Sequence, residues 1–229
     1  AVRRYQDQLA GVIAVEGHNL GRITHAAVGS VRWKVTVRGP GGHSWGAFGK
    51  PSAIHGLGRI IARIAELDVP SSPKTTYNVG VIEGGTSVNT IAPNASAVID
   101  MRSVDAGSLS RLVDQVGRIA TATAGDGLDV AVEVLGERPA GAIPVTHPFV
   151  QGVGDVLRVL GMEPVFEASS TDANVPISLG IPAVCVGISR GSGGHTVNET
   201  IEVEPVATGL AQLVLLAAAS GMITTTRSG

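Results

Sequence analysis

The sequence predicts an α/β protein in which a ferredoxin-like βαββαβ domain interrupts a second, incomplete α/β domain. The first observation is the order of the expected elements between residues 31 and 135, which is β-α-β-β-α-β. The second is a change beyond residue 136, where proline-rich links, helices and an apolar strand follow. The third is a strand within residues 1–30, outside the inserted unit. We therefore expect one domain over residues 31–135 and another formed by residues 1–30 and 136–229.

The segment before the inserted domain contains a helix over residues 2–9 and an apolar strand over residues 12–15. This strand, which we expect to be buried, ends at Glu16. Catalytic groups favour the carboxyl ends of strands in open α/β sheets, so Glu16 is a candidate site residue. Taken alone, it is more simply explained as a solvated carboxylate at a turn. The helix begins without a capping residue, which favours a truncated chain.

The inserted domain begins with the alternating strand 31–37, which is ended by the turn sequence GPGG at residues 39–42. A helix from residue 52, strands over 75–82 and 95–102, a helix over 108–122 and a strand over 128–135 follow. Both helices should cover one face of a single antiparallel sheet. The apolar positions expected to be buried are Val31, Trp33, Val35 and Val37 in the strand, and Ile54, Leu57, Ile61 and Ile64 in the first helix.

The C-terminal segment should contain helices over residues 148–160 and 172–179, a strand over 183–188 and a final helix over 203–221. Cys185 falls in the apolar strand and is expected to be a small core residue. A glycine-rich loop between this strand and the final helix carries His195. The final helix is expected to bury Val206, Leu210, Leu213, Val214 and Ala217.

Composition and charge exclude several classes of function. Lys and Arg number 17 against 19 Asp and Glu, which leaves a net charge of −2 and no basic excess for nucleic acid or an anionic membrane. The longest apolar stretch, residues 210–219, is much shorter than the ~20 residues of a membrane-spanning helix. The first residues have no secretory signal pattern, and the single cysteine cannot form an internal disulfide. We expect a cytoplasmic protein.

Two of the six histidines stand out because each follows a pair of glycines, which present a side chain to a ligand. These are His43 and His195. Either one alone could be an ordinary loop histidine. Among the others, His55 is expected at the surface of a helix and His147 is expected to be a capping or linker residue at a helix start, and no role is assigned to His18 or His25.

Several sequence blocks, taken together and in order, resemble one family of enzymes. In the inserted domain these are GPGGHS at 39–44, EGGTSVNTIAP at 83–93 and DMR at 100–102. Downstream they are STDA at 170–173, GIPA at 180–183 and GGHTVNE at 193–199. The chain is similar to the zinc-dependent family of aminoacylase, carboxypeptidase G, acetylornithine deacetylase and succinyl-diaminopimelate desuccinylase. The resemblance implies a zinc-exopeptidase-like α/β domain carrying a peptidase dimerisation domain.

The resemblance also implies a role for each matching residue. Glu16 and His195 match metal ligands, one for each ion of a zinc pair, with cobalt or manganese as alternatives. His43 matches a histidine that the partner subunit inserts to stabilise the oxyanion. Asn89 and Arg102 match groups that contact the substrate, the arginine at its free carboxylate. Thr171 lies at a further position where the family contacts its substrate.

The implied reaction is hydrolysis of an amide bond in a small peptide or N-acyl amino acid by a homodimer that associates through residues 31–135. The family's remaining metal ligands and its general base belong to a part that this sequence does not match. We therefore expect the 229 residues alone to bind zinc poorly and to be inactive. The alternative is a non-catalytic dimerisation or interaction module. Phosphate binding by the glycine loops is weakly supported, because no P-loop or dinucleotide-binding context accompanies them.

Overall fold

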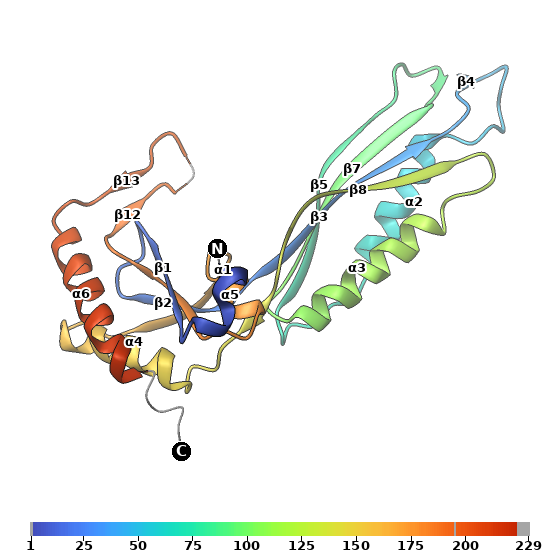
Figure 1. Ribbon diagram of the computed structural model, residues 1–229. Helices are drawn as coiled ribbons and strands as arrows, with labels where there is room; N and C mark the ends of the chain where they lie inside the picture. The colour runs from blue at the N-terminus through green and yellow to red at the C-terminus, as the bar shows by residue number, and fades with distance from the viewer. Residues whose placement is uncertain (1, 195, 224–229) are drawn as a thin grey trace. The chain divides into compact units, whose positions relative to one another are not determined.

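The protein is described here by a computed structural model that defines residues 2–194 and 196–223. The chain divides into two compact units (Figure 1). Unit 1 consists of Ala1–Val28 and Pro139–Gly229, and unit 2 of Gly29–Arg138. Within the described residues, no helix combines the length and the hydropathy needed to cross a membrane.

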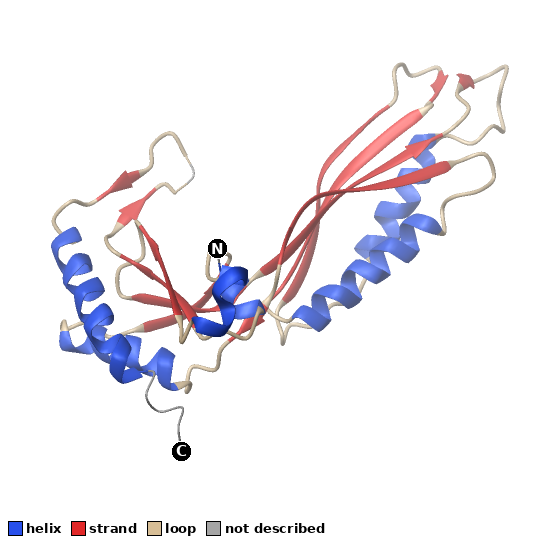
Figure 2. Cartoon of the chain, in the orientation of Figure 1, coloured by secondary structure: helices blue, strands red, loops and turns tan. Residues whose placement is uncertain are grey.

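Unit 2 is a four-stranded antiparallel sheet with strand order β5-β7-β3-β8. The strands are β3 (Gly29–Arg38), β5 (Thr75–Gly84), β7 (Asn94–Ser103) and β8 (Asp129–Arg138), and two helices, α2 (Ala53–Ala65) and α3 (Ala106–Thr121), connect them. Both helices pack on the same face of the sheet (Figure 2). This topology confirms the predicted ferredoxin-like arrangement. A small hairpin at one end of the unit pairs β4 (Gly42–His43) with β6 (Thr90–Ile91).

The core of unit 2 lies between the sheet and its two helices. Val31, Val35 and Val37 of β3 are buried there, as the alternating pattern predicts. The predicted stripe of α2 is partly wrong, because Ile60 is buried and Ile54 is 44% exposed. The reason is Gly56, which faces the sheet so closely that an added Cβ would lie 2.8 Å from the Leu128 side chain. This close approach rotates the helix, so that Leu57, Ile60 and Ile64 face the core.

Unit 1 is built on a sheet with strand order β1-β11-β2-β10, and β9 also pairs with β2. The strands are β1 (Val12–Glu16), β2 (Arg22–Ala27), β9 (Gly141–Ala142), β10 (Val165–Ser169) and β11 (Ala183–Gly187). β1 is parallel to β11, β2 is parallel to β10, and β11 runs antiparallel to β2. A hairpin of β12 (Gly191–Ser192) and β13 (Thr200–Ile201) follows β11. The helices are α1 (Val2–Tyr5), the short 3₁₀ turn η1 (Gln6–Gln8), α4 (Pro148–Val159), α5 (Asn174–Ser178) and α6 (Val206–Ile223).

Strand β11 is buried along its whole length and anchors the core of unit 1, as predicted. The burial predicted for residues 12–15 holds only in part, because Val12, Ile13 and Ala14 are half-buried against the core and Val15 is not buried. Among the described residues β1 pairs with β11 alone, so it is an outer strand, and Val15 is 47% exposed. The strands β2 and β10 were not predicted, because their sequences RITHAA and VFEAS contain charged and small residues instead of an apolar run.

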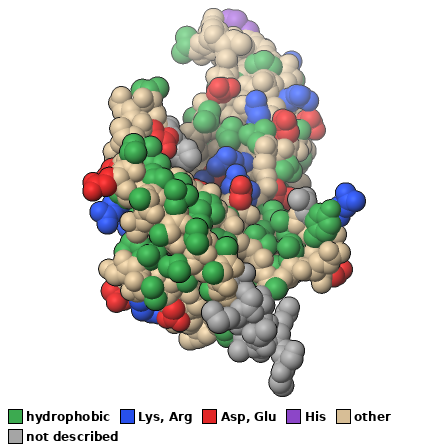
Figure 3. All heavy atoms as spheres, turned by 60° about the vertical axis from the view of Figure 1, so that its left-hand side comes forward, with side chains coloured by type: hydrophobic (Ala, Val, Ile, Leu, Met, Phe, Trp, Pro, Cys, Tyr) green, Lys and Arg blue, Asp and Glu red, His purple; other side chains and the backbone are tan. Residues whose placement is uncertain are grey.

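The buried stripe predicted for the final helix is wrong at three of its five positions, while Val206 and Leu213 are half-buried. Gly209 lies so close to Ile188, the residue that directly follows strand β11, that an added Cβ would overlap the Ile188 backbone. Next along the same face come Gln212, whose Nε2 donates to the Gly187 carbonyl over 3.2 Å, and Leu216, which is 2% exposed. Leu210, Val214 and Ala217 are therefore exposed. The space-filling view accordingly shows hydrophobic side chains at the surface of this unit (Figure 3).

Candidate functional site

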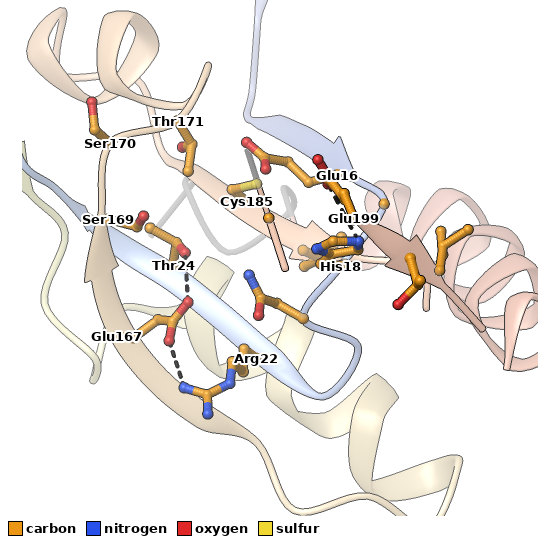
Figure 4. Close-up of a pocket in the computed structure, with 17 residues that line it drawn as sticks. Glu16, His18, Arg22, Thr24, Glu167, Ser169, Ser170, Thr171, Cys185 and Glu199 are labelled. Carbon is orange, nitrogen blue, oxygen red and sulfur yellow. Dashed lines mark hydrogen bonds and ion pairs between the residues drawn. The ribbon is translucent and has the colours of Figure 1, made fainter. Parts of the chain in front are cut away.

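A pocket of about 600 Å³ opens in unit 1 beside the carboxyl ends of β1 and β11, and residues of β2, of β10 and of the loop around β12 and β13 also line it. Its lining is mostly polar, and Figure 4 shows how these side chains surround the space. Two of the predicted site residues, Glu16 and Thr171, line it. Gly194 lines it as well, while His195 itself lies outside the described residues.

Glu16 reaches the pocket because β1 ends there. Its partner in the parallel pairing is Gly187, the last residue of β11. Thr171 is held by local hydrogen bonds at the start of the α5 segment. Its backbone N–H donates to Asn174 Oδ1 over 2.8 Å, and its Oγ1 accepts from the Ala173 N–H over 3.2 Å. Asn174 in turn donates from Nδ2 to the carbonyls of Val28 and Pro139 over 3.0 Å each, which fixes this loop to the sheet.

Cys185 forms part of the floor of the pocket, between Glu16 and Thr171 (Figure 4). It is 4% exposed, in agreement with its prediction as a small core residue. Burial raises the pKa of its thiol to about 11, the nearby Glu16 carboxylate adds to this effect, and a hydrogen bond with Thr171 partly opposes it. At neutral pH the group is a neutral thiol, so it is a poor nucleophile and a poor metal ligand.

We expect Cys185 in the folded protein to resist iodoacetamide at pH 8, because with a pKa of about 11 only about a thousandth of the thiol is ionised. Mass spectrometry after timed labelling measures this directly. Complete labelling in 6 M guanidinium chloride is the control for reagent and access. Rapid, stoichiometric alkylation of the native protein would contradict the burial and the raised pKa.

The turn after β1 is tied to the glycine-rich loop by an ion pair that the sequence did not predict. His18 Nε2 lies 3.5 Å from Glu199 Oε1. Two glycines make room for this turn. An added Cβ on Gly187 would overlap the His18 carbonyl, and one on Gly191 would overlap both the His18 ring and the Thr200 carbonyl. The pair thus fixes one wall of the pocket. The spacing of 181 residues gave no sequence signal for it.

A second ion pair on the opposite wall was also missed. Arg22 Nη1 donates to Glu167 Oε2 over 2.7 Å, and the hydroxyl of Thr24 donates to the other carboxylate oxygen over 3.4 Å. The three residues lie on the adjacent parallel strands β2 and β10. Since neither strand was predicted, the pairing could not have been found from sequence.

The described residues of the pocket do not form a complete metal centre. Among the described residues, no group of three or more His, Cys, Asp or Glu side chains is arranged to hold a metal ion. Glu16 is a single carboxylate, and the adjacent Cys185 is a protonated thiol. Structural and catalytic zinc sites need three or four ligands. The described residues of this chain therefore do not by themselves provide a zinc site.

The predicted residues His43 and Asn89 lie together at the tip of unit 2. β4 pairs with β6 through His43 opposite Thr90, and the Ser44 N–H donates to the Asn89 carbonyl over 2.9 Å. The Nδ1 atom of His43 accepts from the backbone N–H groups of Trp45 and Gly46, at 3.3 and 3.4 Å. In the neutral ring the proton therefore sits on Nε2, so this exposed histidine presents a hydrogen-bond donor.

Asn89 likewise presents a donor. Its Oδ1 accepts a hydrogen bond from the Ser87 hydroxyl over 2.9 Å, and that hydroxyl also lies 2.7 Å from Thr90 Oγ1. With its oxygen engaged, the side chain directs the Nδ2 amino group away from these contacts. The tip of unit 2 thus carries two side-chain donors, from His43 and Asn89, on neighbouring backbone segments.

Arg102 lies elsewhere in unit 2, on strand β7. Its Nε donates to Asp100 Oδ2 over 2.6 Å, and Arg32 Nε donates to the other oxygen over 3.0 Å. Although burial alone raises the pKa of Asp100, the hydrogen bonds and charges of the two arginines outweigh it and hold that pKa below its ordinary value. The stability that this group contributes is thus present at neutral pH and is lost as the pH falls through the lowered pKa. The two arginines and Asp100 together carry a net charge of +1.

The sheet separates Arg102 from the tip. Strand β7 starts at Asn94, which accepts from the Gly85 N–H beside the tip, and Arg102 lies eight residues further along it. At about 3.4 Å per residue the two regions are roughly 27 Å apart. The structure thus brings His43 and Asn89 together and places Arg102 near the other end of the same sheet.

Of the histidines without a predicted site role, His55 is exposed and His147 caps α4 by accepting from the Phe149 N–H, both as expected.

Comparison with known proteins relates this chain to peptidases. Residues 25–127 match the model of the peptidase dimerisation domain of the M20 family. A Mycobacterium tuberculosis protein named for succinyl-diaminopimelate desuccinylase, DapE, is 27% identical over an alignment of 215 residues that covers 88% of this chain and 56% of that protein. The chain thus spans about half the length of the curated relatives it matches.

Solved structures share the fold of nearly the whole chain. Aminopeptidase PepT from Bacillus cereus matches with a TM-score of 0.76 and 24% identity, over 90% of this chain and 56% of PepT. A tripeptidase from Staphylococcus aureus matches with a TM-score of 0.77 and 19% identity, over 94% of this chain and 57% of the tripeptidase. The dimerisation domain, the DapE-like relative and the fold shared with both peptidases thus relate this chain to the M20 family of metallopeptidases.

Proposed function

We propose that this chain forms the C-terminal part of a metal-dependent amidohydrolase or exopeptidase that cleaves an amide bond in small peptides or N-acyl amino acids. The observation that carries the proposal is that Glu16 and Thr171, which the resemblance assigns to metal and substrate, line one pocket together with Gly194, the neighbour of His195. Glu16 and His195 would each give one ligand to a metal centre completed by other residues. Zinc is the metal that the resemblance suggests.

The chain's own residues have separate tasks in this proposal. His43 donates from Nε2 to the oxygen of the amide carbonyl as negative charge develops there, and Asn89 donates from Nδ2 beside it. Arg102 holds the free carboxylate of the substrate, with its position fixed by Asp100. Thr171 contacts the substrate inside the pocket. These donors are positioned before the reaction by backbone and side-chain hydrogen bonds, so little reorganisation is needed.

The distance between Arg102 and the pair His43 and Asn89 within unit 2 limits how these residues can contact one substrate. Arg102 and the pair His43 and Asn89 are roughly 27 Å apart along β7, which is far longer than a small peptide or N-acyl amino acid. If all three contact one substrate, they must come from two copies of the chain. A homodimer formed through unit 2, in which one copy supplies His43 and Asn89 and the other supplies Arg102, satisfies this requirement.

A second candidate is a dimerisation module without catalytic activity, which the match of residues 25–127 to a dimerisation domain favours. We expect the protein to be a dimer by light scattering, because the outer strands β5 and β8 can pair about a two-fold axis. We also expect the complete enzyme of which this chain is proposed to form a part to release the amino acid from N-acyl amino acids when supplied with zinc, whereas these 229 residues alone are expected to be inactive. A dimeric complete protein without turnover would favour the second candidate, and a monomer at tens of micromolar would contradict both.

A further inference from the structure

Two backbone segments carry the chain out of unit 1 and back into it. The chain leaves unit 1 after Val28 and re-enters it at Pro139. On the unit 1 side these crossing segments pair as β2 and β9, with Ala27 opposite Gly141, and in unit 2 they continue as the neighbouring strands β3 and β8. Val28 and Pro139 lie in the short breaks between these strands. Their carbonyl groups lie outside both ladders, so they need other hydrogen-bond donors.

One side chain, that of Asn174, supplies both donors. Its Nδ2 donates to the Val28 carbonyl and to the Pro139 carbonyl over 3.0 Å each, and its Oδ1 accepts from the Thr171 N–H over 2.8 Å. Asn174 is 2% exposed. An amide side chain has two N–H donors and one carbonyl oxygen, so each of these groups is engaged. We call Asn174 and its three backbone partners the Asn174 clasp.

The loop that carries Thr171 holds Val28 through both of its backbone groups. The Val28 carbonyl accepts from Asn174, and the Val28 N–H donates to the Ser169 carbonyl over 2.9 Å. Ser169 and Thr171 both line the pocket of unit 1 (Figure 4). The segment 169–174 therefore contacts both the pocket and the crossing segments. A buried network of this kind fixes one arrangement, because a buried polar group that loses its partner is costly.

We propose that Asn174 is a positioning residue, which makes the place of Thr171 in the pocket depend on the two crossing segments. The proposal rests on the proposed function, in which Thr171 contacts the substrate. Asn174 is not one of the described residues that line the pocket, so it acts through the Thr171 backbone. A shift of either crossing segment breaks a bond to Nδ2, and the Asn174 side chain can follow that shift only by giving up the Thr171 N–H. By reciprocity, substrate held at Thr171 stabilises the crossing segments.

Asn174→Asp separates the clasp from the local turn between Thr171 and Asn174. Aspartate keeps an oxygen that accepts from the Thr171 N–H, but it cannot donate to both carbonyls, because a carboxyl group has at most one proton. In the variant of this chain we expect the Val28 and Thr171 amides to exchange hydrogen about tenfold faster, as measured by NMR. If the buried carboxyl prevents folding, Asn174→Ser makes the same comparison, because its single hydroxyl can donate to only one carbonyl.

Gln151→Glu is the matched control. Gln151 Nε2 donates to the Val145 carbonyl over 2.8 Å, so this substitution also removes a side-chain donor from a backbone carbonyl of unit 1. It leaves the Asn174 clasp intact. Exchange of the Val28 and Thr171 amides should therefore be unchanged in this variant.

Kinetics of the complete enzyme, of which this chain is proposed to form a part, test whether the clasp acts through Thr171. For N-acetyl amino acids we expect Asn174→Asp to raise KM about tenfold with little change in kcat, because a displaced Thr171 weakens a contact made in the ground state and the transition state alike. In a Thr171→Ala background, Asn174→Asp should have little further effect. A general structural loss would instead add to the effect of Thr171→Ala.

The outcomes separate the inference from the function on which it rests. Unchanged exchange of the Val28 and Thr171 amides in Asn174→Asp would overturn the clasp and leave the proposed function standing. Additive kinetic losses, or equal losses in Gln151→Glu, would also overturn it, because Asn174 would then stabilise the fold alone. If the complete enzyme does not hydrolyse N-acyl amino acids, the proposed function fails. The exchange data then decide the clasp by themselves, since joint acceleration at Val28 and Thr171 supports it and acceleration at only one of them overturns it.

Discussion

His43→Ala is expected to lower kcat/KM for N-acyl amino acids by about 10²–10³, with little change in folding stability. The imidazole is exposed, so its loss leaves no cavity in the core. Its Nε2 donor stabilises charge that develops only in the transition state, so the loss should fall mainly on kcat. Steady-state kinetics at saturating zinc, on the complete enzyme of which this chain is proposed to form a part, measure this. His55→Ala, at an exposed histidine on α2, is the matched control and should have full activity.

Subunit mixing tests whether His43 acts in the partner's site. Equal amounts of His43→Ala and Glu16→Gln protomers, each nearly inactive alone, should regain activity after subunit exchange. With random exchange half of the dimers are mixed, and each mixed dimer has one site with both an intact Glu16 and an intact partner His43, so about a quarter of wild-type activity should return. Absence of recovery despite exchange shown by mass spectrometry would place His43 in its own subunit's site or outside catalysis.

The fold could be predicted from sequence wherever one pattern dominated. The alternation of Val31, Trp33, Val35 and Val37 and the fully apolar strand that contains Cys185 gave correct strands, because each reflects burial on one or on both faces of a sheet. Strands β2 and β10 were missed because their positions in the sheet are set by pairing with distant segments, which a local pattern does not encode. The same holds for the two glycines, Gly56 and Gly209, at which close backbone approach turned α2 and α6 away from their predicted faces.

The candidate site could be predicted where a residue follows a recognisable turn. Glu16 at the end of a strand and His43 after paired glycines both belong to such local sequences. The pairs His18 with Glu199 and Arg22 with Glu167 could not be found, because their members are more than 140 residues apart and no motif surrounds them. The raised pKa of Cys185 depends on burial and on the nearby Glu16, which are both tertiary properties.

Arg102→Ala is expected to reduce kcat/KM for substrates with a free α-carboxylate by about tenfold to a hundredfold, while the carboxamide analogues lose little. A hydrogen bond to a charged group contributes about 1.5–3 kcal/mol, and about 1.4 kcal/mol corresponds to a factor of ten. The ratio of the two kcat/KM values before and after mutation isolates the ionic contact from any general loss of activity. Arg102→Lys should restore the charge but only part of the effect, because lysine lacks the bidentate fork.

Arg32→Ala is the matched control for this prediction. Arg32 and Arg102 bind the two oxygens of the same carboxylate, Asp100, and both side chains are partly exposed. Either substitution therefore removes one of the two charges that lower the pKa of Asp100, with a similar effect on stability. Only the loss of Arg102 should change the preference for a carboxylate over a carboxamide. If both variants lose activity equally on both substrates, Arg102 stabilises the strand and does not recognise the substrate.

Mixing Arg102→Ala with His43→Ala protomers then tests the arrangement that the length of β7 requires. If Arg102 serves its own subunit's pocket and His43 serves the partner's, each mixed dimer contains one site with both groups intact. About a quarter of wild-type activity should return for substrates with a carboxylate, as in the mixture with Glu16→Gln. If both residues served the partner's pocket, every site in the mixed dimer would lack one of them and no recovery would occur. That second result would mean that one substrate contacts both ends of a strand roughly 27 Å long, which no small peptide can do. It would therefore require Arg102, His43 or both to act outside substrate binding.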